Sequence, residues 1–179
     1  MMSEEKPAPE IRLWTPEGFR EDEWAHTETA EALAGNDRLI LPLQAFLGLD
    51  PQERTRNRGR LGVLVQPGEQ IDTLVELLDE VALIALVFPA YTDGRSYSKA
   101  QLLRGRHGFE GTLRAVGDVL VDQLAHMLRV GFTEFAISNP VLLRRLEKGE
   151  VGGLPVYYQP AAKPAAATGS YSWRRVPQS

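Results

Sequence analysis

The chain of 179 residues contains no cysteine. This absence excludes disulfide bonds, thiolate nucleophiles, zinc ribbons and cysteine-bound iron–sulfur clusters. The chain cannot hold a cysteine-ligated redox centre by itself, and we expect it to bind no cofactor and no metal.

Long apolar runs are also missing. The longest, from Val81 to Tyr91, has 11 residues, whereas a membrane-spanning helix needs about 20. The first residues, "MMSEEKPAPEIRLW", contain no apolar signal core. We therefore expect a cytoplasmic protein that does not contact a membrane.

An excess of positive charge is absent, since the net charge is -4 and the pI is near 5.5. Nucleic-acid binding depends on many Lys and Arg side chains that displace counterions, so we expect no nucleic-acid partner. The charge is uneven, however. The first 31 residues contain nine acids and three bases, whereas residues 88–118 contain five bases and three acids. A small anion or an acidic protein surface could bind in this second segment.

Common nucleotide-binding and hydrolase motifs are missing as well. The sequence contains no G-x-G-x-x-G, no G-x-x-x-x-G-K-[ST], no H-E-x-x-H and no G-x-S-x-G. Short motifs therefore identify no reaction.

What is present divides the chain into three parts. Residues 1–37 form an acidic N-terminal segment with a candidate hairpin around Pro16-Glu17-Gly18. Residues 38–159 alternate between strand-like and helix-like patterns, and residues 160–179 are rich in Ala, Pro, Ser and Gly, as in a flexible tail. We expect one folded domain with loose ends.

The alternating region predicts an α/β fold with a mostly parallel sheet and right-handed crossover helices. The clearest strands begin near Leu61, Ala82, Thr112 and Thr133, after an earlier strand-like "RLILPL", and "LPVYYQP" is a candidate last strand. We expect four to six strands in an open doubly wound sheet or a partial (βα) barrel, because a full eight-stranded barrel typically needs about 250 residues.

Polar residues follow three of these strands. Ligands bind at the carboxyl ends of parallel strands, so the residues after "ALIALVF", "TLRAV" and "TEFAIS" could share one rim. A helix N-terminus there would attract an oxyanion, with Arg95 or Arg114 as a fork-shaped partner.

A structural explanation competes with this hypothesis. Ser98 and Gln101 match a capping box, Gly94 permits a tight turn, and Asp93 can bond its own backbone. Asn139 is a typical N-cap before Pro140.

One helical face in "GDVLVDQLAHMLRVGF" carries three polar residues. Asp118, Asp122 and His126 are spaced by four residues and could begin a metal site or a proton relay. A solvated face with Asp118 as the N-cap explains the same spacing and is the preferred interpretation.

Residues 38–160 resemble a bacterial family of unknown function, family 934, whose members are described as involved in sulfite reduction. The resemblance rests on "FPAYTDGRSYSKAQLLR", followed by "LRAVGDV", "DQ" and "GF". Ser96 and Thr112 stand where many members have Gly and Glu. The candidate binding rim that the resemblance implies, together with the pattern above, comprises Thr92, Asp93, Gly94, Arg95, Tyr97, Ser98, Arg104, Arg114, Asp118, Asp122 and Gln123.

The resemblance implies an accessory protein of assimilatory sulfite reduction whose partner is a sulfite reductase component or its electron donor. Two alternatives stay open. One is a small-oxyanion-binding enzyme that uses Asp93, Arg95, Arg114 and Asp118, with a carboxylate as acid or base. The other is a self-associating module that forms a homo-oligomer through its charged stretch.

Overall fold

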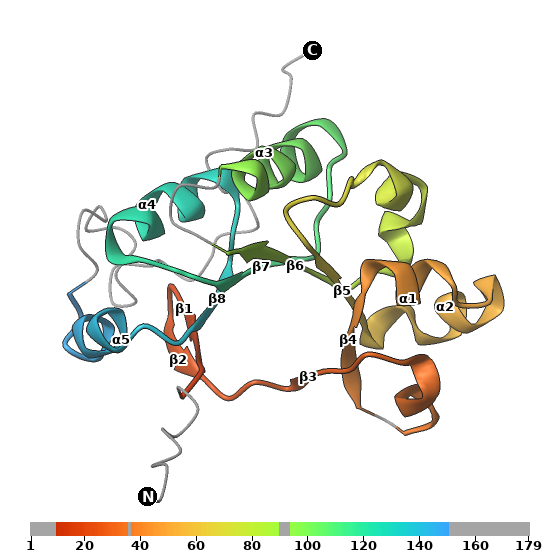
Figure 1. Ribbon diagram of the computed structural model, residues 1–179, viewed down its shortest axis with the longest axis horizontal. Helices are drawn as coiled ribbons and strands as arrows, with labels where there is room; N and C mark the ends of the chain where they lie inside the picture. Colours follow the sequence, from red (N-terminus) through yellow and green to blue (C-terminus); the bar gives the residue numbers. More distant parts are fainter. Residues whose placement is uncertain (1–9, 36, 90–93, 151–179) are drawn as a thin grey trace, which may run out of the picture.

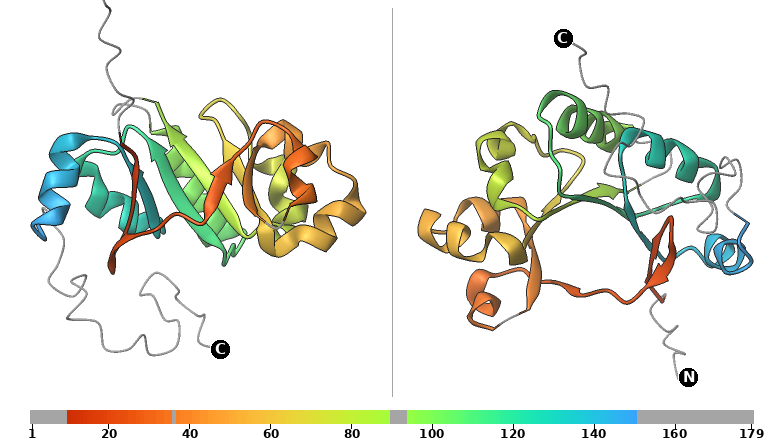
Figure 2. Two further views of the ribbon diagram at one scale, coloured as in Figure 1. Left: turned by 90° about the horizontal axis from the view of Figure 1, so that it is seen from below. Right: turned by 180° about the vertical axis from the view of Figure 1, so that it is seen from behind.

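The computed structural model describes residues 10–35, 37–89 and 94–150. In these residues one eight-stranded sheet, of order β2-β1-β8-β7-β6-β5-β4-β3, curves into a half-barrel with helices on its convex outer face (Figures 1 and 2). Strands β3 to β8 are parallel neighbours in chain order. Their bounds are β3 (Trp24–His26), β4 (Arg38–Pro42), β5 (Leu61–Val65), β6 (Leu83–Phe88), β7 (Thr112–Gly117) and β8 (Glu134–Ile137).

An N-terminal hairpin completes the sheet at the β8 side. Strands β1 (Arg12–Thr15) and β2 (Gly18–Arg20) pair antiparallel, and β1 also pairs antiparallel with β8. The chain then crosses the open side of the half-barrel to β3 (Figure 1). We call the crossing residues 21–23 the strap, because they join the two outermost strands of the sheet.

Helical segments connect the parallel strands along the convex face. The segment from Leu102 to Arg106 continues α3 as a π-helical turn. The segments are η1 (Ala30–Ala34), α1 (Leu43–Leu47), α2 (Pro51–Asn57), η2 (Arg58–Arg60), η3 (Asp72–Glu80), α3 (Arg95–Gln101), η4 (Leu102–Arg106), α4 (Val121–Val130) and α5 (Pro140–Glu147). In the described part of the chain, none of these helices has the length and apolar character needed to cross a bilayer.

Alternating side chains give the sheet two apolar layers. On the convex side, residues such as Val63, Leu86 and Leu113 pack against the helices in the main core. On the concave side, a smaller cluster of Ile40, Leu83, Ala85 and Val116 is covered partly by Trp24. Gly62 leaves room for this indole, because a Cβ there would lie 3.0 to 3.4 Å from Ile40, Trp24 and Leu83.

The α/β class, the parallel sheet and the partial-barrel alternative are confirmed, but the expected strand count of four to six is too low. The expected hairpin supplies β1 and β2, and a three-residue strand inside the acidic segment supplies β3. The doubly wound alternative is wrong because the helices cover one face only (Figure 2). The candidate strand in "LPVYYQP" and the tail 160–179 lie outside the described residues.

The helix ends correct two sequence interpretations. Asn139 caps α5 as expected, since its Oδ1 accepts hydrogen bonds from the N–H groups of Val141 and Leu142 at 2.9 and 3.1 Å. Ser98, in contrast, lies inside α3, whose N-cap is Gly94. Asp118 does not cap α4, which begins three residues later after Leu120. The helices begin where the backbone leaves the strand ends, and these points did not coincide with the best capping side chains.

Candidate functional site

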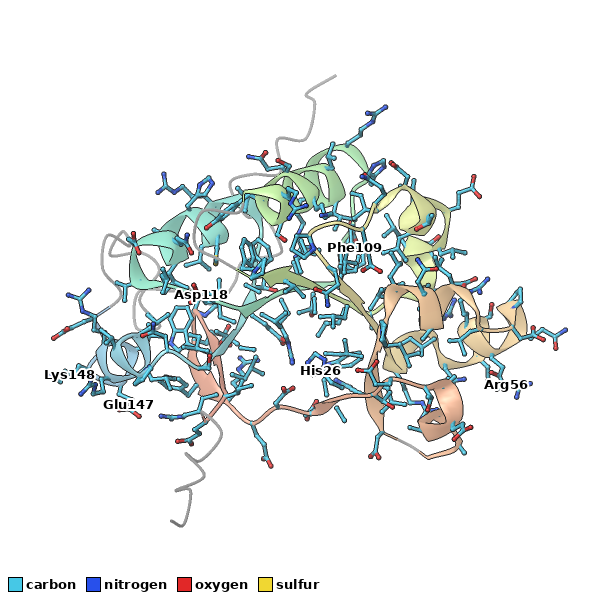
Figure 3. All side chains as sticks on the ribbon, in the orientation of Figure 1. His26, Arg56, Phe109, Asp118, Glu147 and Lys148 are labelled. Carbon is cyan, nitrogen blue, oxygen red and sulfur yellow. The ribbon has the colours of Figure 1, made fainter. Side chains whose placement is uncertain are left out.

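The carboxyl ends of β6 and β7 meet in a tight backbone contact. Gly117 has φ +90°, and a Cβ there would lie 2.5 Å from the carbonyl oxygen of Phe88. The Asp118 N–H donates to that same oxygen at 2.6 Å. The glycine of the "GDV" motif is thus required by the backbone, and it places the partly exposed Asp118 at the end of β7 (Figure 3).

Beside this contact, α3 and α4 bring two parts of the family pattern together. The Tyr97 ring from α3 lies edge-on to Phe88 at 5.0 Å and is tilted against the ring of His126 from α4 at 4.6 Å between ring centroids. Burial, and then the charge of Asp122, raise the pKa of the Tyr97 hydroxyl. The hydroxyl therefore stays protonated at neutral pH and can donate a hydrogen bond. Gln123, one residue after Asp122, is partly buried at the same helix start.

Two buried polar side chains anchor α3 to the strand ends. The Ser96 hydroxyl donates to the carbonyl of Val87 at 2.7 Å, and the Lys99 ammonium donates to the carbonyl of Pro67 at 2.6 Å. Both residues are at least 90% buried. They hold the first turn of α3 in place, which leaves Gly94, Arg95 and Ser98 exposed. Thr92 and Asp93 lie outside the described residues.

Arg104 has a different role from the one that a binding rim requires. Its guanidinium is buried and donates to the carbonyls of Gly131, Phe109 and Gly111 at 2.7 to 3.1 Å. These carbonyls belong to the loops that enter β7 and β8, at the end of the sheet opposite Asp118. Arg104 therefore ties the π-helical turn to these loops, and its donors are directed to backbone.

Arg114 points into the concave side of the half-barrel and is fully buried. Its Nη1 and Nη2 donate to the two carboxylate oxygens of Asp22 at 2.9 and 3.0 Å, and its Nε and Nη2 donate to Glu134 at 2.9 and 2.8 Å. Asp22 lies in the strap and Glu134 begins β8. The guanidinium thus connects the strap to the middle of the sheet through two carboxylates.

His26 of β3 lies beside this cluster and is exposed to solvent. It shares the concave face with Trp24, two residues earlier, and Figure 3 shows it over the interior of the half-barrel. Partial burial and the nearby Arg114 lower the pKa of His26, and Asp22 opposes the shift. The imidazole is therefore neutral at physiological pH.

A cavity of about 370 Å³ opens at the amino ends of the strands, next to Arg114. Its charged lining contains three arginines and three glutamates, and most of them are already in contact with one another. Arg38 pairs with Glu23 at 3.1 Å, for example. The lining residues that carry charge are Arg20, Glu21, Glu23, Arg38, Arg114 and Glu134.

The predicted rim residues therefore separate into three groups. Tyr97, Asp118 and Asp122 lie near the carboxyl ends of β6 and β7, Arg104 lies at the opposite end, and Arg114 lies inside the half-barrel. Arg114 precedes Asp118 by four residues, which is about 13 Å along a strand. The structure does not bring Arg114 to the carboxyl-end rim.

Sequence reasoning missed the acidic partners of Arg114. Asp22 is 92 residues away in the chain and Glu134 is 20 residues away. Asp22 sits in a run of acids that carries no signal for a buried contact. Glu134 begins a strand-like segment, and an inward charged residue there is detectable only once its neighbour β7 is known.

Residues that could hold a metal ion do not cluster: in residues 10–35, 37–89 and 94–150 no group of three or more His, Asp or Glu side chains is arranged for one.

Residues 62–168 match the model of a family described as "Bacterial protein of unknown function (DUF934)". The match covers more than half of the 179 residues. No curated protein matches the chain.

Proposed function

The chain belongs to the bacterial family of unknown function DUF934, and we propose that it acts as an accessory protein of assimilatory sulfite reduction. In this role it binds a sulfite reductase component or the electron donor of the reductase. The resemblance of its "FPAYTDGRSYSKAQLLR" segment to the family supports the pathway. The lack of cysteine supports an accessory role, because a cysteine-ligated cluster would have to reside on another subunit.

The observation that best supports a protein-binding role is that the side chains of Arg104 and Arg114 are buried inside the protein. Both guanidinium groups are at least 90% buried and donate to groups of the chain itself. These two arginines therefore stabilise the fold. The exposed cations of this region lie on the helices instead, with Arg95 on α3 and Arg129 on α4.

The surface charge of residues 94–150 favours an acidic partner. Among exposed residues, the segment 94–150 carries six Lys and Arg against four Asp and Glu, whereas the segment 10–89 carries four against thirteen. A basic face on a protein that is acidic overall attracts an acidic protein surface and increases the association rate at low salt. We assign the exposed face of α3 and α4, around Arg95, His126 and Arg129, to this contact.

Affinity capture tests the proposal directly. The full chain, tagged at either end, is captured from cells that are assimilating sulfate and from cells supplied with reduced sulfur. We expect a sulfite reductase component or its electron donor in the first sample only. The recovered partner is then purified, and its binding to the chain is measured at low and high salt.

Charge reversal shows whether the assigned face is used. The double variant Arg95→Glu, Arg129→Glu should bind the purified partner at least about tenfold more weakly, because it replaces attractive rim contacts by repulsive ones. Arg56→Glu on α2, at the far side of the molecule (Figure 3), is the matched control and should bind normally. Absence of any reductase component or donor with both tags would refute the proposal.

A small-oxyanion-binding enzyme is the second candidate. The protonated Tyr97 hydroxyl and the carboxylate of Asp118 at the end of β7 favour it, because together they offer a donor and a base near the carboxyl ends of β6 and β7. Arg114 has no part in this version. Titration calorimetry with sulfite and sulfate should show binding that Arg95→Ala abolishes, and the absence of heat with both anions would exclude it.

A further inference from the structure

A groove of about 510 Å³ runs along the convex surface between η3 and the end of the α3–η4 helix. Figure 1 shows these two segments side by side, in yellow-green and green, above β5 and β6. One wall is the η3 surface with Asp72 and Glu76, and the other wall carries Arg106 and His107. The two walls thus have opposite charge.

Part of the groove lining is apolar. Leu102 is 41% exposed and is one of three large hydrophobic residues classed as exposed in the described part of the chain. Val75 and Leu77 of η3 line the groove beside it and are partly buried. Exposed apolar surface with a polar border is typical of a protein contact site.

The backbone fixes the position of Leu102. It begins the π-helical turn, and its carbonyl accepts the His107 N–H at 3.0 Å across five residues. Arg104 holds this turn through its bonds to Phe109, Gly111 and Gly131. A π-turn is uncommon and is often found at functional sites. Leu102 is therefore displayed by a rigid, internally bonded element.

The charges of the two walls are not satisfied across the groove. Among the described residues, neither Glu76 nor Arg106 takes part in an ion pair, and both side chains are exposed. A macromolecule that fills the groove would be basic where it meets η3 and acidic where it meets η4. A second copy of the chain meets this requirement, because it presents the same basic wall and the same acidic wall.

We propose that the groove is a homodimer interface with a two-fold axis parallel to its length. Such an axis places η3 of one protomer against η4 of its partner, so that Glu76 faces Arg106 twice and the two Leu102 side chains share the apolar centre. The exposed walls favour this occupant over a small molecule, because small-molecule pockets enclose most of their ligand.

Analytical ultracentrifugation of the full chain over a range of concentrations tests the interface. We expect a reversible dimer that weakens at high salt. Glu76→Arg and Arg106→Glu should each raise the dimer dissociation constant about tenfold or more, because each reversal acts at two symmetric contacts. The double variant Glu76→Arg, Arg106→Glu should restore dimerisation, which loss of folding could not do.

Two further variants complete the experiment. Leu102→Ser removes the apolar centre and should also weaken the dimer, whereas Arg145→Glu on α5 changes the same charge away from the groove and should have no effect. A protein that is monomeric at every concentration would overturn the proposal. So would a dimer that is indifferent to the single reversals, or one that the double variant fails to restore.

The outcome is independent of the proposed function. Binding of a reductase component or electron donor is measured with the same variants, and loss of that binding in Glu76→Arg without a wild-type dimer would assign the groove to a different protein and refute the homodimer. A restored dimer in the charge-swapped variant would stand even if no such partner is found.

Discussion

Replacement of Arg114 by Met should destabilise the protein by about 3 kcal/mol. Met keeps most of the buried volume but removes the four hydrogen bonds to Asp22 and Glu134. Removal of one partner from a buried ion pair typically costs about 3–5 kcal/mol. The lower value applies here because the side chains of Asp22 and Glu134 are 37% and 21% exposed, so water can solvate part of each unpaired carboxylate.

Urea unfolding followed by circular dichroism measures this loss, and the midpoint should fall while the slope stays the same. In thermal unfolding the same loss lowers Tm by about 6–12 °C for a chain of this size. Arg38→Met is the matched control, because Arg38 also contacts the strap, through Glu23, but in an exposed pair. Its cost should stay within about 1 kcal/mol.

A double-mutant cycle isolates the contact with the strap. Asp22→Asn in the wild type should cost about 1–2 kcal/mol after allowance for its partial exposure. In the Arg114→Met background the same change should be neutral or stabilising, because it removes an unpaired carboxylate. If Arg114→Met costs no more than Arg38→Met, or if the effects of Arg114→Met and Asp22→Asn simply add, then the contacts of Arg114 with Asp22 and Glu134 do not stabilise the fold.

Three other expectations follow from single residues. Gly117→Ala should cost about 2–3 kcal/mol by chemical denaturation, because its φ of +90° and the 2.5 Å approach to Phe88 leave no room for a methyl group; wild-type stability would contradict this. In a spectrophotometric titration, the difference between wild type and Tyr97→Phe should show a tyrosine that ionises above its usual range, and Asp122→Asn should lower that pKa; an unchanged titration would exclude the effect of Asp122. The pKa of His26 is lowered from 6.5 in the folded protein, so the unfolded chain binds more protons as pH falls through that value and the free energy of unfolding should decrease from pH 7 to pH 5. His26→Gln should reduce this decrease. An equal pH dependence of stability in both proteins would contradict the lowered pKa of His26.

The strands with continuous apolar sequence were predictable, and those without it were not. The run that forms β6 lies between two parallel neighbours and is apolar on both faces, so its composition alone indicates a covered strand. Strand β3 has only three residues, Trp24–His26, and borders a charged strap. Its position depends on pairing with β4, which no pattern within Trp24–His26 indicates.

The candidate site shows the same difference between local and distant information. The convergence of Tyr97 and Asp122 follows from two consecutive βα units and was within reach of the sequence. The burial of Arg114 was not, because its partner Asp22 lies in the strap, 92 residues earlier in the chain. An arginine within a strand-like segment is typical both of a ligand contact and of an interior ion pair, so the sequence does not distinguish the two.

The pairing of β1 with β8 has a consequence for biosynthesis. Arg12 and Ile137 are register partners although they are among the first and last residues of the described chain. During translation the hairpin must therefore wait, unpaired on its β8 side, until almost the whole sheet has left the ribosome. Strands β4 to β7 can assemble in order as they emerge, since each pairs with the strand before it. Pairing of β1 with β8 can therefore form only after these strands have been synthesised.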